Sequence, residues 1–257
     1  MVYGNHLEQK TTLTEALSVT ITPGSVITAV GAGGKTSLLF TLGRELAAAG
    51  YRTVITTTTH MGRPCSGKAD HPAYQGVSFV CMHEKEARER IPTLLASEKL
   101  VFAAAPDPEN ACKVTAPSAE DFTYLREQAD ILLVEGDGSR RLPLKWPAPW
   151  EPVIPEATAC TVCVAGLSAL GRPCHDVIYR AEDIPNEFSS GDQVTEELIS
   201  LILSSPAGGR KHARGSFRVF LNQVDSPELQ QAALRILKTL DGAGIAGAWG
   251  KLQQTGG

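Results

Sequence analysis

A glycine-rich turn between an apolar segment and a helical segment constrains this chain more than any other feature. The apolar run at 25–30 predicts a buried strand. The turn follows at once and reads Gly31-Ala32-Gly33-Gly34-Lys35-Thr36. From 36 to 49 the leucines recur at helical spacing, and Gly50 is a typical helix stop. The β-branched segment 51–58 then predicts a second strand, which completes a βαβ unit of a parallel sheet.

The turn has the parts that a phosphate-binding P-loop requires. Small residues let backbone N–H groups point at phosphate oxygens, a lysine reaches the β- and γ-phosphates, and the next hydroxyl coordinates Mg²⁺. We therefore predict a site for a nucleoside triphosphate, GTP or ATP, with Mg²⁺. Its predicted ligands in this segment are Gly31, Ala32, Gly33, Gly34, Lys35, Thr36 and Ser37, with Lys35 also catalytic. Ala29 stands where the common pattern has its first glycine, so we expect a variant first turn.

The strand–helix pattern continues along the chain and predicts the fold class. Further strands are predicted at 77–81, 100–104, 131–134, 161–165 and 218–221. Helices are predicted at 13–17, 84–97, from Ser118 onward, and at 227–240. Alternating strands and helices indicate an α/β fold, a mostly parallel sheet flanked by helices in a P-loop NTPase-like, three-layer architecture.

Length and composition bound the organisation of the chain. At 257 residues, 42% of them hydrophobic, we predict a single domain over 1–257 with irregular insertions near 61–76 and 141–155. A net charge of −4 gives no general attraction to nucleic acid or anionic lipid, and no apolar run reaches the roughly 20 residues that span a bilayer. We expect no nucleic-acid or membrane partner. Six cysteines in a chain this long indicate free thiols and a cytoplasmic location.

Two acids follow the apolar run at 131–134. Glu135 and Asp137, interleaved with glycines, match a Walker B element, in which a carboxylate at the end of a neighbouring strand lies beside the P-loop hydroxyl. We predict that Thr36, Glu135 and Asp137 hold Mg²⁺ and that both acids take part in catalysis. The residues leave open which acid is the ligand and which positions water.

A possible base-recognition element lies near the C-terminus. Asn222-Gln223-Val224-Asp225 follows a predicted strand and resembles the N-K-x-D element by which GTPases hold guanine. We predict that Asn222 and Asp225 bind the nucleotide. Gln223 replaces the lysine, which weakens the guanine reading, and a plain turn explains the segment almost as well.

Other polar residues are open to two readings. Thr56, Thr57, Thr58 and Thr59 with His60 end the second strand and could sense the γ-phosphate, although threonines are also good strand material. Cys160 and Cys163 have metal-pair spacing, but in a strand they point to opposite faces, so we interpret them as core residues. Cys65, near His60 and His71, is the one cysteine retained as a candidate ligand.

Together these segments resemble the YqeC family of proposed selenium-dependent hydroxylase accessory proteins, from about residue 15 to about residue 250. The segments that carry the resemblance are 31–36, 56–59, 135–140, 144–145, 151–155, 179–182 and 221–225. The resemblance implies a P-loop NTPase-like fold and a role in maturing molybdenum hydroxylases, with such a metalloenzyme as client. It also draws attention to the charged insert residues Arg140, Arg141, Lys145 and Glu151, which could bind an anionic second substrate or a partner.

Three functions fit the sequence. The leading one is a nucleotide-binding maturation factor with slow NTPase activity, the hydrolysis of a phosphoric anhydride. The second is a small-molecule kinase or ligase that uses the segment 140–155 for its second substrate. The third is a nucleotide-gated scaffold with negligible turnover.

Overall fold

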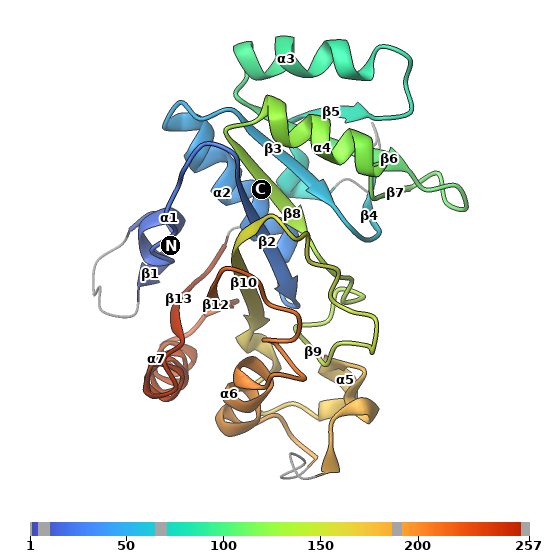
Figure 1. Ribbon diagram of the computed structural model, residues 1–257. Helices are drawn as coiled ribbons and strands as arrows, with labels where there is room; N and C mark the ends of the chain where they lie inside the picture. The colour runs from blue at the N-terminus through green and yellow to red at the C-terminus, as the bar shows by residue number, and fades with distance from the viewer. Residues whose placement is uncertain (1, 5–10, 65–70, 187–191, 253–257) are drawn as a thin grey trace.

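The computed structural model describes residues 2–4, 11–64, 71–186 and 192–252 (Figure 1). In these ranges eleven strands form one sheet, in the order β1-β13-β12-β10-β2-β8-β3-β6-β7-β4, with β5 paired to β6. The long central strands all run parallel. A two-stranded parallel sheet, β9 with β11, lies apart from it. The strands span Val2–Gly4 (β1), Ser25–Gly31 (β2), Thr53–Thr57 (β3), Met61–Gly62 (β4), Ser78–Cys81 (β5), Leu100–Pro106 (β6), Lys113–Thr115 (β7), Ile131–Glu135 (β8), Leu144–Lys145 (β9), Thr158–Gly166 (β10), Ile178–Tyr179 (β11), Ser216–Asn222 (β12) and Ala246–Gly250 (β13).

Helices connect most of the parallel strands. The α-helices span Leu13–Ala16 (α1), Lys35–Ala48 (α2), Ala87–Ser97 (α3), Ala119–Gln128 (α4), Cys174–Val177 (α5), Glu196–Ser204 (α6) and Pro227–Gly242 (α7). In the described ranges three short 3₁₀ turns, η1 to η3, cover Pro72–Tyr74, Leu167–Ala169 and Ala181–Asp183. Side-chain caps set several of the helix starts: Ser118, Thr195 and Ser226 each accept a backbone N–H in the first turn of α4, α6 and α7.

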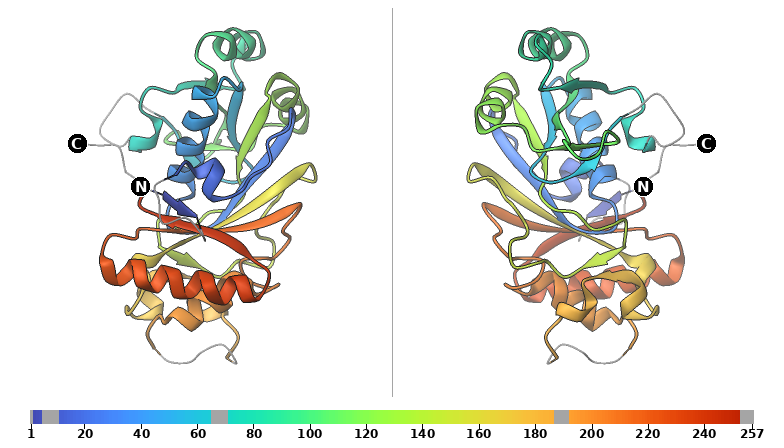
Figure 2. Two further views of the ribbon diagram at one scale, coloured as in Figure 1. Left: turned by 90° about the vertical axis from the view of Figure 1, so that its left-hand side faces the viewer. Right: turned by 90° about the vertical axis from the view of Figure 1, so that its right-hand side faces the viewer.

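Alternating side chains of the sheet divide the core into two sides, which makes the molecule three layers deep (Figure 2). On β2, Ile27 and Ala29 pack with the leucines of α1 and α2 in one hydrophobic cluster. Val26 points the other way, into a cluster with α3 and α4, and Val30 joins a third cluster with α6 and α7. Helices α3, α4, α6 and α7 therefore share one face of the sheet, and α1 and α2 cover the other.

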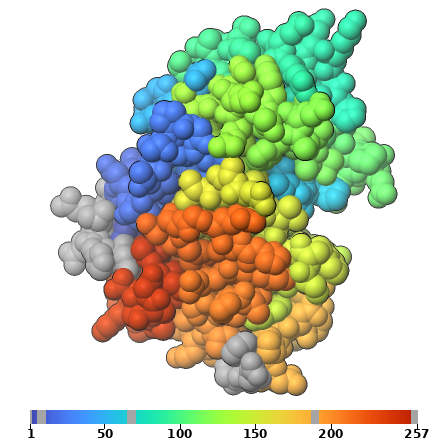
Figure 3. Space-filling view, in the orientation of Figure 1, coloured from blue at the N-terminus to red at the C-terminus, as the bar shows by residue number. Residues whose placement is uncertain are grey.

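The space-filling view shows how the two halves meet. Green and blue segments of the first half and orange segments of the second half meet along a band of yellow atoms (Figure 3). The continuous sheet explains this packing, because β10 pairs with β2 and β8 pairs with β3 in register. The P-loop strand thus lies at the centre of the sheet.

The predicted fold class, a mostly parallel sheet flanked by helices, is confirmed. The predicted strands at 25–30, 51–58, 131–134, 161–165 and 218–221 are all present with shifted ends. Two predictions need correction. The strand β2 continues one residue past its predicted end to Gly31, so Ala29 lies in the buried sheet, as the predicted strand at 25–30 implies, and the variant first turn expected there is absent. The segment 141–155 is not wholly irregular, because Leu144–Lys145 forms β9.

The other insertion, near 61–76, holds β4 and η1, and its residues 65–70, with the candidate ligand Cys65, lie outside the described ranges. None of the helices in the described part of the chain is both long and apolar enough to cross a lipid bilayer.

Candidate functional site

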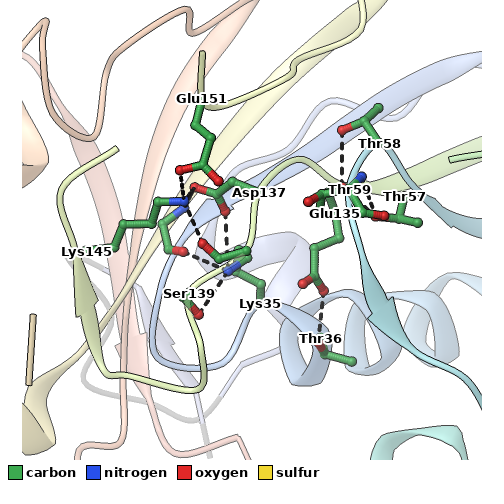
Figure 4. Close-up of polar contacts among 12 residues, drawn as sticks. Lys35, Thr36, Thr57, Thr58, Thr59, Glu135, Asp137, Ser139, Lys145 and Glu151 are labelled. Carbon is green, nitrogen blue, oxygen red and sulfur yellow. Dashed lines mark hydrogen bonds and ion pairs between the residues drawn. The ribbon is translucent and has the colours of Figure 1, made fainter. Parts of the chain in front are cut away.

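The candidate site lies where neighbouring parallel strands end together. Strand β8 is paired on one side with β2, where Ala29 is opposite Glu135, and on the other with β3, where Thr57 is opposite Glu135. This register brings the glycine turn after β2 against the acids after β8 (Figure 4). The order of strands and acids in the sequence predicts this juxtaposition, because the carboxyl ends of parallel strands share one edge of a sheet.

Close packing explains the glycines of the turn. Gly33 has φ +80°, and a Cβ there would lie 2.3 Å from the backbone nitrogen of Gly166. Gly34 has φ +127°, and a Cβ there would lie 2.2 Å from Nδ2 of Asn222. Only glycine tolerates both the left-handed conformation and the approach. The turn therefore packs closely against the ends of β10 and β12.

The helix that follows the turn starts without a side-chain cap. Gly34 is the N-cap of α2, and among the described residues no side chain accepts the N–H groups of the first helical turn. These donors, together with the positive end of the helix dipole, are suited to an anion such as phosphate.

The first site pair joins the P-loop hydroxyl to a strand-end acid. Thr36 Oγ1 donates a 2.8 Å hydrogen bond to Oε2 of Glu135. Burial raises the pKa of Glu135; the positive charge of Lys35 and the hydrogen bond from Thr36 oppose this shift, and the charge of Asp137 adds to it. Threonine hydroxyl and carboxylate oxygens are hard donors of the kind that Mg²⁺ selects.

The second group of site residues is a series of ion pairs among buried charged side chains. Nζ of Lys35 lies 3.3 Å from Oδ1 of Asp137 and donates to the carbonyl oxygen of Gly31 at 2.7 Å. Oδ2 of Asp137 accepts from the backbone N–H of Gly31 at 3.1 Å and lies 3.1 Å from Nζ of Lys145. Lys145 in turn lies 2.7 Å from Oε2 of Glu151. Lys35, Asp137 and Lys145 are each less than 5% exposed, so the pairing keeps the buried charge balanced.

The two acids thus occupy different surroundings. Glu135 faces Thr36, and Asp137 lies between the two lysines. Oδ1 of Asp137 makes an ion pair with Lys35 but has no hydrogen-bond partner among the described residues. The two acids could not be distinguished from the sequence. In the structure they differ because Lys145 of the proline-rich segment contacts Asp137.

The threonines at the end of β3 hold the backbone of β8 at Glu135. The hydroxyls of Thr57 and Thr58 both donate to the carbonyl oxygen of Glu135, at 3.1 and 3.3 Å, and Thr58 also donates to the carbonyl oxygen of Val153 at 2.7 Å. His60 pairs instead with Asp107 at 3.4 Å, and that contact places its ring beside the β6–β7 connection. A γ-phosphate-sensing role for these residues stays a prediction.

Asn222 and Asp225 lie in different environments. Asn222 is buried, donates from Nδ2 to the carbonyl oxygen of Gly33 at 2.7 Å and accepts from the N–H of Leu252. Asp225 is half exposed and lies 2.8 Å from Nζ of Lys251. Gln223, at φ +61°, hydrogen-bonds to Ser168. Asn222 therefore supports the P-loop from behind, and the pairing of Asp225 with Lys251 had no signal in the sequence.

The cysteines of β10 point to opposite faces, as the strand period predicts. Cys160 packs in the cluster with α1 and α2, and Cys163 in the cluster with α6 and α7. Burial raises the pKa of Cys163 to about 12 and also raises the pKa of Cys160. Both thiols behave as core side chains.

A helix-covered, mostly parallel sheet with a glycine turn and a carboxylate strand side by side defines a P-loop NTPase-like fold. The comparisons with known proteins give the family. The family model described as "YqeC protein" matches residues 27–182. The Escherichia coli (strain K12) protein named "Uncharacterized protein YqeC" is 33% identical over 242 residues, which cover 90% of this chain and 88% of that protein. The chain therefore belongs to the YqeC family.

Among solved structures, the crystal structure of FtsY from Mycoplasma mycoides is similar at a TM-score of 0.42 and 12% identity. The match covers 91% of this chain and 62% of the FtsY chain, so this chain spans less than two thirds of that protein's length.

Proposed function

We propose that this chain binds a nucleoside triphosphate with Mg²⁺ at residues 31–37 and hydrolyses it slowly. The observation that carries the proposal is the 2.8 Å hydrogen bond from Thr36 to Glu135 beside the buried ammonium of Lys35. It places a hydroxyl, a carboxylate and a cation together at the uncapped start of α2. These are the groups that a P-loop site needs for the metal and for the phosphates.

The donor set fits Mg²⁺. Thr36 and Glu135 would hold the ion directly or through water, and Asp137, whose Oδ1 has no hydrogen-bond partner among the described residues, would accept from a water of the metal shell. In the described ranges no group of three or more His, Cys, Asp or Glu side chains is placed to hold a metal, so phosphate and water would complete the coordination. When bound, Mg²⁺ supplies charge stabilisation to the transferring phosphoryl group.

The roles of the remaining residues follow from their places. The backbone N–H groups of Gly33, Gly34 and the first turn of α2 would bind phosphate oxygens. Lys35 would leave Asp137 and neutralise the charge that develops in the transition state. Asp137 would keep its pairing with Lys145, and so would orient water at the γ-phosphate without becoming an unpaired buried charge.

The resemblance to proposed hydroxylase accessory proteins gives the biological setting. We propose that nucleotide turnover drives delivery or assembly of a cofactor component on a client metalloenzyme, a selenium-dependent molybdenum hydroxylase. The hydrogen bond from Thr58 to Val153 and the ion pair of Lys145 with Glu151 tie the proline-rich segment to the site. A client that contacts this segment would therefore reach the acids directly.

A small-molecule kinase or ligase is the second candidate. The observation in its favour is that the segment 141–155 reaches Asp137 through Lys145, so a second substrate bound there would lie beside the P-loop.

We propose further that Asp225 contacts the base. Its carboxylate is half exposed, and guanine N1–H would have to compete for it with Lys251. Competition of GTP and ATP for one fluorescent nucleotide analogue tests this role. Tighter binding of GTP that Asp225→Ala abolishes supports it, and equal affinities exclude guanine specificity.

Product analysis distinguishes the candidate reactions. Purified chain is incubated with radiolabelled GTP or ATP and Mg²⁺, alone and with the client hydroxylase, and both free phosphate and phosphorylated products are measured. Slow phosphate release that the client accelerates supports the maturation factor. A phosphorylated small molecule, with no phosphate release when the acceptor molecule is absent, supports the kinase. Nucleotide binding without either product supports the scaffold.

A further inference from the structure

Three cationic side chains surround one aromatic ring next to the Lys35–Asp137 pair. The guanidinium carbons of Arg140 and Arg180 lie 5.1 and 5.5 Å from the ring centroid of Tyr179, and Nζ of Lys145 lies 5.7 Å from it. The pairing of β9 with β11 aligns Tyr179 with Lys145. Each contact with the ring is favourable, but the three like charges repel one another.

The carboxylates nearby are shared unevenly among these three cations. Lys145 has Asp137 and Glu151, and Arg180 lies 3.1 Å from Asp183. Arg140 has no ion pair with any carboxylate of the described residues. The guanidinium of Arg140 is therefore available to an anionic ligand.

The backbone at the same place is strained. Arg140, Arg141 and Arg180 have φ values of 48°, 64° and 63°, in the left-handed region that bulky residues rarely occupy. Nε of Arg180 is buried and has no hydrogen-bond partner among the described residues. Backbone strain and an unsatisfied buried donor in one cluster are typical of a functional site rather than of a structural one.

We propose that Arg140 and Arg180, with the exposed ring of Trp150, form a binding site for a small anionic ligand that carries a phosphate or carboxylate group. A guanidinium binds either group through two parallel N–H donors. Arg180 already lies 5.3 Å from the centroid of Trp150, which is 67% exposed and would close over the ligand.

The ligand would lie beside the phosphates of the nucleotide. Arg140 directly follows Ser139, whose hydroxyl is 3.4 Å from Nζ of Lys35. The interpretation of the ligand as a second substrate rests on the proposed function, whereas anion binding by the two arginines does not.

The test uses Lys35→Ala, in which the P-loop cation is removed, and wild-type chain with Mg²⁺ and a non-hydrolysable nucleotide. Inorganic phosphate and, separately, citrate are titrated by calorimetry and by tryptophan fluorescence. We expect one of the two anions to bind in both preparations, and the anion that binds identifies the group recognised. Trp150→Phe should remove the fluorescence change and keep the heat of binding.

Arg140→Ala and Arg180→Ala should each weaken binding about tenfold or more. Arg140→Lys, which keeps the charge but not the fork, should give an intermediate loss. Arg210→Ala is the matched control, because Arg210 also lies over a ring, that of Phe217, and should bind like wild type. The proposal is overturned if neither phosphate nor citrate binds. It is also overturned if Arg140→Ala, Arg180→Ala and Arg210→Ala bind the anion with equal affinity. If wild-type chain fails to bind nucleotide but Lys35→Ala still binds the anion, the proposed function is overturned and the anion site is not.

Discussion

The hydroxyl of Thr36 donates a 2.8 Å hydrogen bond to Glu135, although 99 positions separate the two residues in the chain. Two features bring them together: the in-register pairing of β2 with β8 and the three-residue turn that starts α2 beside the end of β8. In our proposal the ion replaces this hydrogen bond, and the two oxygens become its protein ligands or hold its waters. The proposed function therefore predicts that changes at this contact alter the effect of Mg²⁺ on nucleotide binding.

Thr36→Ala should remove most of the gain in nucleotide affinity that Mg²⁺ confers. The variant loses one oxygen donor to the metal, and we expect about a tenfold weaker Mg-nucleotide complex, with affinity in EDTA nearly unchanged. Calorimetry with and without Mg²⁺ measures both. Thr123→Ala is the control, because its hydroxyl binds a backbone carbonyl within α4. An unchanged Mg²⁺ gain in Thr36→Ala would refute the assignment of Thr36.

Glu135→Gln should stabilise the nucleotide-free protein at neutral pH and weaken Mg-nucleotide binding. Burial raises the pKa of Glu135 in the folded state, so the ionised carboxylate opposes folding. As pH falls through that raised pKa, the folded state takes up a proton before the unfolded state does, and wild-type stability gains. The advantage of the variant should therefore be largest at neutral pH and should shrink on acidification.

Thermal unfolding at several pH values measures this difference. Glu127→Gln, on the exposed side of α4, is the control and should show no such pH-dependent gain. A Glu135→Gln variant that is less stable than wild type at neutral pH contradicts the account.

Asp137→Asn should destabilise the fold strongly. The change leaves the buried ammonium of Lys35 without its carboxylate and Lys145 with Glu151 alone, and such a loss costs about 3–5 kcal/mol. Glu84→Gln breaks the exposed pair with Arg90 and should cost about 1 kcal/mol or less. Urea unfolding measures both, and equal costs would show that the buried charges are not coupled as the distances indicate.

Cys163 should resist alkylation in the folded protein. Burial raises its pKa to about 12, so almost no thiolate forms at neutral pH, whereas Cys112 is exposed. Iodoacetamide treatment followed by peptide mass mapping should modify Cys112 in the native state and Cys163 only in denaturant. Equal labelling of the two native thiols would contradict the position of Cys163 in the core.

The central strands and the edge they share could be predicted because buried parallel strands are short, continuous apolar runs. The approach of Thr36 to Glu135 follows from that pattern. Several other elements were not predicted, among them three strands. Strand β13, AGAWG, has too many small residues to show a strand pattern, and β9 and β11 are two residues long each.

The difference in surroundings between the two acids also required the structure. Asp137 differs from Glu135 because Lys145 reaches it from a proline-rich segment that has no sequence periodicity. Gly166 had an available signal, since it directly follows the predicted strand at 161–165, at the same edge as Gly33. A Cβ on Gly166 would lie 2.2 Å from Oε1 of Gln223. Helix α6 had a signal too, in the Thr195 cap before an apolar-rich segment.

Titration calorimetry of GTP and ATP into wild-type chain and Lys35→Ala, each with Mg²⁺ and with EDTA, tests the central claim most directly. We predict one nucleotide per chain, bound more tightly with Mg²⁺ by wild type and at least about tenfold more weakly by Lys35→Ala, because the variant lacks the cation that faces the phosphates. No binding of either nucleotide to wild type, or equal affinity in the variant, would contradict the assignment of this turn as a nucleotide site.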